Sequence, residues 1–105
     1  MDSKALLIFL NNLPPATRRK IIDQLQKKQI EGAISHIFSS LLKKKIPIHV
    51  STLKKLKPYK KIIKLLATGK TSASKKKQIL KSQRGGSLLA LLLPLAVTAI
   101  HKLFA

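Results

Sequence analysis

The amino-acid sequence predicts an all-α protein: short helices in a loose small bundle, with a basic helical segment and a C-terminal apolar helix. Apolar residues recur at spacings of three and four along most of the chain. No strand-like alternation of apolar and polar residues persists over any stretch. Proline and glycine divide the helical pattern into short segments, as at Pro14-Pro15, Pro47 and Gly69.

The first part of the chain predicts three helices. One lies within residues 1–13 and stops in the run Asn11–Pro15. Pro15 suits the first turn of a second helix, which runs to about Lys28. A third covers residues 30–44 and ends before Pro47. We expect the second and third helices to pack as an antiparallel pair. The charged residues of the second helix should stay solvated, namely Arg18, Arg19, Lys27 and Lys28.

The next part predicts two further helices. Ser51 or Thr52 can cap a helix that carries an apolar stripe, and Pro58 should make that helix kink or begin anew. Gly69 ends it. The polar run 71–74 offers caps for a short basic helix over residues 75–82.

Charge and apolarity divide the chain into three regions: an N-terminal helical region (1–45), a basic region (46–86) and a hydrophobic tail (87–105). Lys and Arg outnumber Asp and Glu by 22 to 3, which gives a formal net charge of +19. Self-repulsion at this charge opposes compaction, so we expect no sizeable single core and a structure that an anionic partner stabilises.

The block from Lys43 to Arg84, which covers the end of the N-terminal region and most of the basic region, contains the candidate nucleic-acid-binding residues, and no carboxylate lies among them in the sequence. Such a block would neutralise phosphates and release counterions. Nearly all its cations are lysines, which favours contact with the backbone over reading of bases. Tyr59 is the only aromatic there and is expected to pack between helices, so duplex DNA is the preferred partner over single strands. Nuclear import is a compatible second role. The candidate residues are Lys43, Lys44, Lys45, Lys54, Lys55, Lys57, Lys60, Lys61, Lys64, Lys70, Lys75, Lys76, Lys77, Lys81 and Arg84.

The junction between the basic region and the tail contains Gly85 and Gly86. Paired glycines break helices, so this junction predicts a flexible, exposed hinge that a protease could cut. The tail after Ser87 is borderline in length for a membrane helix and contains Pro94. It could insert into a bilayer, lie in the interface or pack on protein. The residues for membrane contact or packing are Leu88, Leu89, Leu91, Leu92, Leu93 and Leu95.

Catalysis and metal binding have no support in the sequence. The histidines, His36, His49 and His101, are scattered, and the chain has no cysteine. The acidic residues, Asp2, Asp23 and Glu31, are not paired in sequence. We therefore expect a protein without cofactor, metal or enzymatic activity.

The order of these features resembles the precursor of the adenovirus core protein mu (protein X), and above all the protein-X-like virion proteins of adintoviruses and Polinton-type elements. A basic stretch, then Arg-Gly-Gly, then a Leu/Pro/Ala-rich tail carries the resemblance. It covers about residues 33–100, in the segments Ala33–Ile37, Lys45–Ile48, Leu56–Lys61, Lys75–Leu80, Gln83–Gly86 and Leu91–Leu95.

The resemblance implies a virion protein that is packaged with the viral genome and condenses it, located in the virion and the host nucleus. It also implies a viral maturation protease as a partner, with cleavage between Gly86 and Ser87 and with Gly85 in the protease cleft. The family's protease prefers an aliphatic residue at the position that Gln83 occupies here. The leading alternative is a membrane-active cationic protein with a hydrophobic C-terminal anchor; a host structural DNA-binding protein is a third.

Overall fold

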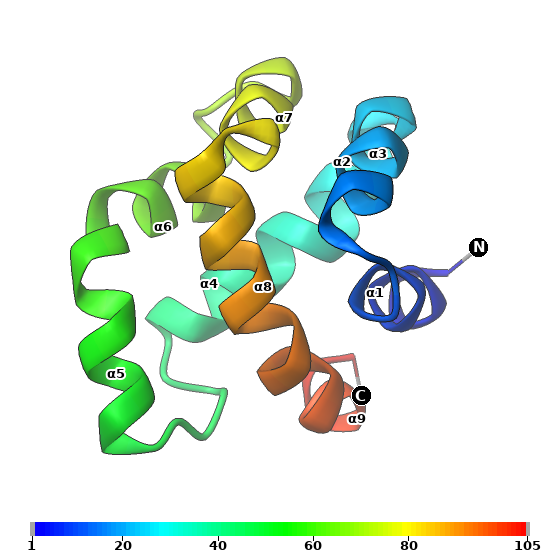
Figure 1. Ribbon diagram of the computed structural model, residues 1–105. Coiled ribbons are helices and arrows are strands. Elements are labelled where there is room, and N and C mark those ends of the chain that lie inside the picture. Colours follow the sequence, from blue (N-terminus) through cyan, green and yellow to red (C-terminus); the bar gives the residue numbers. More distant parts are fainter. Residues whose placement is uncertain (1, 105) are drawn as a thin grey trace.

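The computed structural model describes residues 2–104, and all regular secondary structure within that range is helical (Figure 1). The all-α prediction, with short helices in a small bundle, is therefore confirmed. The elements are α1 (Ser3–Asn11), α2 (Pro15–Gln24), α3 (Lys27–Gln29), the π-helical turn η1 (Ile30–Ser35), α4 (His36–Leu42), α5 (Val50–Leu56), the 3-10 turn η2 (Lys57–Tyr59), α6 (Lys60–Ala67), α7 (Ala73–Lys81), α8 (Gln83–Thr98) and α9 (Ile100–Leu103).

The ends of α1 and α2 follow from single polar or proline residues. The Asp2 carboxylate accepts a hydrogen bond from the Ala5 amide at 2.7 Å and so caps α1. Pro15 occupies the first turn of α2, as predicted. The helix stops at Gln24, earlier than expected, because Leu25 leaves the helical region (ψ 143°) and its side chain turns into the core.

The segments α3, η1 and α4 follow one another without a break, as the apolar spacing over residues 30–44 predicted. This continuous helical segment ends at Leu42, with Lys43 as its C-cap. Lys44 then adopts a left-handed conformation (φ 58°). The predicted antiparallel pair is wrong: α2 packs chiefly on α7, and α4 packs chiefly on α6. An apolar face on α2 or α4 does not indicate which other apolar face covers it, and here α7 and α6 provide the covering faces.

Pro58 interrupts the helical pattern as expected, through η2, and separate helices lie on either side of that turn. The cap of α5 is His49, not Ser51 or Thr52, because the His49 ring accepts from the Ser51 amide at 3.3 Å. Ser72 caps α7, where its hydroxyl accepts from the Lys75 amide at 3.2 Å.

The apolar helix α8 crosses the face of the bundle that is turned toward the viewer in Figure 1, and it packs against α1 and α7. Leu88, Leu89, Leu92 and Leu93 are fully buried, and Leu91 and Leu95 are half-buried. Packing on protein is therefore the arrangement that the structure has for this segment. No helix among residues 2–104 combines the length and the apolar character that a membrane span requires.

The expectation that no sizeable core would form is wrong. A single cluster of buried aliphatic and aromatic side chains includes residues from each of the three regions of the sequence. The radius of gyration is 12.3 Å, close to the value of about 13 Å for a compact chain of this length. The charge repulsion therefore does not prevent a compact core, in which α8 buries Leu88, Leu89, Leu92 and Leu93.

The predicted flexible hinge at the glycine pair is also wrong. Gly85 and Gly86 lie in the first turn of α8, which Ser82 caps by accepting from the Gly85 amide at 3.1 Å. Gly85 is buried, and a Cβ placed on it would lie 1.8 Å from the Ile79 carbonyl oxygen. Gly85 therefore allows α7 and α8 to meet at a tight corner, and the glycine pair does not break the helix.

Candidate nucleic-acid interface

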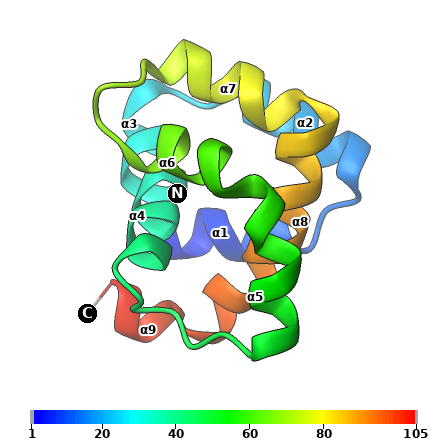
Figure 2. The same cartoon turned by 90° about the vertical axis from the view of Figure 1, so that its left-hand side faces the viewer.

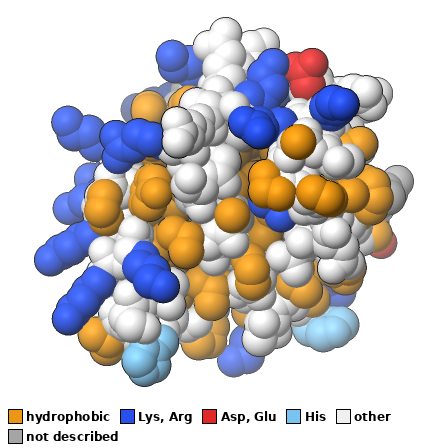
Figure 3. Space-filling model, in the orientation of Figure 1, with side chains coloured by type: hydrophobic (Ala, Val, Ile, Leu, Met, Phe, Trp, Pro, Cys, Tyr) orange, Lys and Arg blue, Asp and Glu red, His pale blue; other side chains and the backbone are white. Residues whose placement is uncertain are grey.

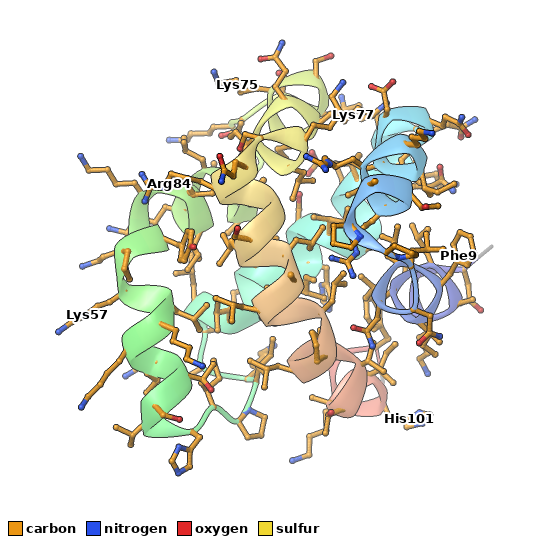
Figure 4. All side chains as sticks on the ribbon, in the orientation of Figure 1. Phe9, Lys57, Lys75, Lys77, Arg84 and His101 are labelled. Carbon is orange, nitrogen blue, oxygen red and sulfur yellow. The ribbon has the colours of Figure 1, made fainter. Side chains whose placement is uncertain are left out.

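The segment α5–η2–α6 forms one exposed, basic edge of the molecule. The buried Leu56, Ile63 and Leu66 face the core, which directs the intervening lysines toward solvent. In Figure 2 this edge faces the viewer, and Lys57 projects outward from it in Figure 4. The exposed lysines of this edge, called the α5–α6 lysines below, are Lys54, Lys55, Lys57, Lys60, Lys61 and Lys64.

Further exposed lysines extend this surface. Lys43, Lys44 and Lys45 follow the C-terminal end of α4, where cations are favourable beside the helix dipole. Because α4 packs on α6, this cluster lies next to the α5–α6 lysines. Figure 3 shows lysine side chains along the left-hand part of this face, where Figure 1 draws α5. Lys70 and Lys75 are exposed in the loop before α7 and in its first turn.

Lys76 does not belong to the exposed surface, contrary to the prediction that it binds nucleic acid. Its side chain is fully buried, and its ammonium group lies 2.9 Å and 3.0 Å from the two carboxylate oxygens of Glu31. The ammonium also donates to the Ser35 hydroxyl at 2.7 Å. All three of its donors are thereby used inside the protein.

Lys81 and Lys77 are both bound to Asp23 of α2. The Lys81 ammonium lies 2.6 Å from the Asp23 carboxylate, and Lys77 donates to the Asp23 carbonyl at 3.2 Å. The hydrogen bond and the positive charge of Lys81 lower the pKa of Asp23 below its ordinary value. The sequence offered no carboxylate to this block, but folding brings Asp23 and Glu31 to α7, so α7 contributes less free charge than predicted.

Arg84 is exposed, and two contacts hold it over η2. It donates to the Pro58 carbonyl at 2.8 Å, and its guanidinium lies 5.6 Å from the centre of the Tyr59 ring. Tyr59 itself is half-buried against the core, as the sequence analysis expected for a packing residue.

The three carboxylates with described positions serve the fold: Asp2 caps α1, Asp23 binds Lys81, and Glu31 binds Lys76. Among residues 2–104, neither salt bridge involves Lys43, Lys44, Lys45 or any of the α5–α6 lysines. The positive charge of that surface is therefore neutralised only by solvent ions or by a bound partner.

Arg18 is a second cation that the sequence placed in solvent incorrectly. It is buried against the end of α1, where its guanidinium donates to the Leu10 carbonyl at 2.9 Å and to the Leu13 carbonyl at 3.0 Å. Desolvation lowers the pKa of Arg18. Outside the predicted block, exposed cations also occur on α2, α3 and α9, namely Arg19, Lys20, Lys27, Lys28 and Lys102.

The residues of the predicted cleavage site lie near the start of α8, and the histidines do not gather into a metal site within residues 2–104. Within the first two turns of α8, Gly85 is buried, Gly86 is half-buried and Ser87 is exposed. No group of three potential metal ligands occurs within residues 2–104. The His36 ring contacts the Leu103 carbonyl at 2.6 Å, and His101 lies at the opposite end of the molecule from Lys75 in Figure 4.

The burial of Lys76 could have been predicted from its spacing relative to the apolar residues of α7, although a count of charged residues does not show it. Ala73, Lys76 and Leu80 follow one another at intervals of three and four, so they share one face of α7. Leu80 is buried in the core and Ala73 packs against the core, and Lys76 occupies the position between them.

Comparison of the chain with protein-family models, with curated proteins and with solved structures finds no match.

Proposed function

We propose that this protein binds double-stranded DNA through the phosphate backbone, without sequence preference. The observation that carries the proposal is the surface formed by Lys43, Lys44, Lys45 and the α5–α6 lysines, which has no carboxylate partner within residues 2–104. Binding would replace the counterions around these lysines by phosphates, which releases the ions that both partners had condensed.

Backbone contact is favoured over base reading by the residue types on this surface. Lysine is a flexible point charge, whereas base edges are read mostly by forked groups such as arginine. Arg84 is the single arginine of the block, and its guanidinium is already engaged with Pro58 and Tyr59. Tyr59 packs against the core and is not free for stacking with unpaired bases.

The wider role that we propose is that of a virion core protein, which condenses viral DNA within the virion and the host nucleus. This proposal depends on the resemblance to protein-X-like virion proteins as well as on the charge. In the same scheme the chain is a precursor that a viral maturation protease cuts between Gly86 and Ser87. The bond between Gly86 and Ser87 lies within α8, so α8 must unwind locally before a protease can cut it. The cut would separate most of α8 from the bundle, and the basic region would then lose the core against which it packs.

The test of DNA binding uses the full chain and two matched triple variants. We expect Lys54→Gln/Lys61→Gln/Lys64→Gln to reduce the slope of log affinity against log salt by about 2 to 3, since each phosphate contact contributes about 0.9. The control, Lys20→Gln/Lys27→Gln/Lys28→Gln, removes the same charge from α2 and α3 and should change the slope by less than about 1. Two duplexes of unrelated sequence should bind alike. Equal losses in both triples would show a diffuse charge effect and contradict an interface at this edge.

The processing proposal has its own measurement. Mass spectrometry of mature particles should find a chain whose N-terminus is Ser87 and another that ends at Gly86. Only uncut chains in mature particles would contradict processing and leave DNA binding unaffected.

A membrane-active protein anchored by residues 87–105 has less support. The leucines that would form the anchor, Leu88, Leu89, Leu92 and Leu93, are fully buried in the core. Exposing them would remove α8 from the bundle and leave the apolar faces of α1 and α7 in water.

A further inference from the structure

An apolar groove lies on the basic surface, between α4, α5 and α6. Its volume is about 260 Å³, and its lining combines Leu42, Leu53 and Ile63 with Lys44, Lys57 and Lys60. Aliphatic side chains thus form the walls, while three ammonium groups lie around them. DNA offers phosphate charge to these lysines but no aliphatic surface to fill the groove, so the groove is not explained by the proposed function.

The apolar residues at this edge are unusually open to solvent. Val50, Leu53 and Leu42 are 63%, 50% and 47% exposed, the highest values among the large hydrophobic residues with described positions. Val50 and Leu53 are one helical turn apart on α5, so their side chains point to the same side. Figure 3 shows hydrophobic side chains between the lysines on this part of the face. Three such residues gathered at one place indicate a surface that becomes covered.

The charge restricts what can cover it. A second copy of the chain would bring another net charge of +19 against a surface without carboxylates, which is strongly unfavourable. The occupant must therefore be anionic and apolar at once. A short acidic peptide could fill the groove, but Val50 and the outer lysines of α5 and α6 lie beyond the groove lining. A laterally extended anionic surface matches the whole edge better.

We propose that the α4–α5–α6 edge docks onto bilayers that contain anionic phospholipids. Leu42, Val50 and Leu53 enter the region between headgroups and acyl chains, and Lys44, Lys57 and Lys60 contact the anionic headgroups. The short helix α5 lies flat on the bilayer, with its apolar residues buried and its lysines at the headgroup level. Each lysine near an anionic surface adds attraction that salt weakens. Since DNA uses the same lysines, bilayer and duplex compete for this edge.

The experiment measures co-sedimentation of the full chain with vesicles of phosphatidylcholine and phosphatidylserine at roughly 0.15 M salt. The variant Leu42→Ser/Leu53→Ser keeps every charge and changes only half-exposed side chains. We expect its partition onto these vesicles to fall at least about tenfold, because two apolar side chains no longer leave water. Its affinity for duplex DNA should stay within about twofold, because all phosphate contacts are retained.

Leu65→Ser is the matched control, since Leu65 is 42% exposed on α6 but outside the groove. It should bind the vesicles like the original chain, and far-ultraviolet circular dichroism should show all variants to be equally helical. The proposal is overturned if the double variant binds vesicles as well as the original chain, if Leu65→Ser loses as much, or if pure phosphatidylcholine vesicles bind equally. It is also overturned if vesicles fail to bind and an acidic amphipathic peptide binds instead. Because DNA affinity is measured separately, these outcomes are distinct from failure of the proposed function.

Discussion

The Lys76 ammonium lies 2.9 Å from a carboxylate oxygen of Glu31, and the Lys76 side chain is fully buried while that of Glu31 is 34% exposed. This pair joins α7 to the π-helical turn η1, across 45 residues of sequence. Ser35 completes the shell around the ammonium. The two partners are therefore unequal: the carboxylate can still be hydrated when the pair is broken, and the ammonium cannot.

Removal of the two partners should have unequal effects on stability. We expect Glu31→Gln to lower the free energy of unfolding by about 2–3 kcal/mol, because it leaves a buried ammonium without its counter-charge. Lys76→Met should cost only about 1 kcal/mol, because it keeps the aliphatic volume and leaves Glu31 partly in water. Urea unfolding followed by circular dichroism measures both values. A larger loss for Lys76→Met would contradict the assignment.

The adjacent glycines of α8 should respond in opposite directions to alanine. Gly85→Ala places a Cβ 1.8 Å from the Ile79 carbonyl oxygen, whereas the nearest atom to a Cβ on Gly86 is 3.8 Å away. We expect Gly85→Ala to destabilise by about 2 kcal/mol or more, through displacement of backbone at the α7–α8 corner. Gly86→Ala should stabilise by about 0.5–1 kcal/mol, as alanine is the better helix former. Thermal unfolding of both variants tests the corner, and equal effects would argue against it.

The contact between Asp23 and Lys81 should be visible in an acid titration. The pKa of Asp23 is lowered in the folded protein by the hydrogen bond and charge of Lys81, whereas in the unfolded chain it takes its ordinary value of about 3.9. The stabilising effect is therefore present above that ordinary value, and it is lost as the pH falls through the lower, folded-state pKa. Carbon-detected NMR of the carboxyl group measures the midpoint. Lys81→Gln should move it upward, and so should high salt, because the pair is exposed and screened.

Arg18 and Arg19 are neighbours in sequence that should differ sharply on substitution. Arg18→Met removes two hydrogen bonds to the Leu10 and Leu13 carbonyls, and we expect a loss of about 2 kcal/mol since charge-assisted bonds at buried carbonyls are lost. Arg19 is exposed, so Arg19→Met should change stability by less than about 0.5 kcal/mol. Urea unfolding of the two variants gives the comparison; similar values would show that the contacts of Arg18 contribute little.

Local sequence signals predicted the helices well and their partners poorly. Pro15, Pro58 and Ser72 act on the backbone beside them, so their effects could be inferred from position alone. The packing of α2 on α7, and of Glu31 against Lys76, joins residues far apart in sequence. Spacing indicates that a face is apolar, but it does not indicate which other apolar face will cover it.

The same distinction explains what was missed in the candidate interface. Charge counting identified the α5–α6 lysines, because no tertiary contact changes their exposure. It could not separate them from Lys76 and Lys81, whose carboxylate partners arrive only on folding. The glycine pair was misjudged because a glycine required for close packing and a glycine that loosens the chain look the same in sequence.

The packing of α1 against α8 determines when this protein can fold. Leu6, Leu7 and Leu10 of α1 are made about seventy residues before the helix that covers them, so their contacts have a large sequence separation. On the ribosome, the bundle cannot close until residues 88–103 have emerged from the exit tunnel. The nascent chain is until then an open polycation beside ribosomal RNA. Completion of α8 therefore converts it, in one late step, from a chain attracted to any polyanion into a folded surface with a defined set of exposed lysines.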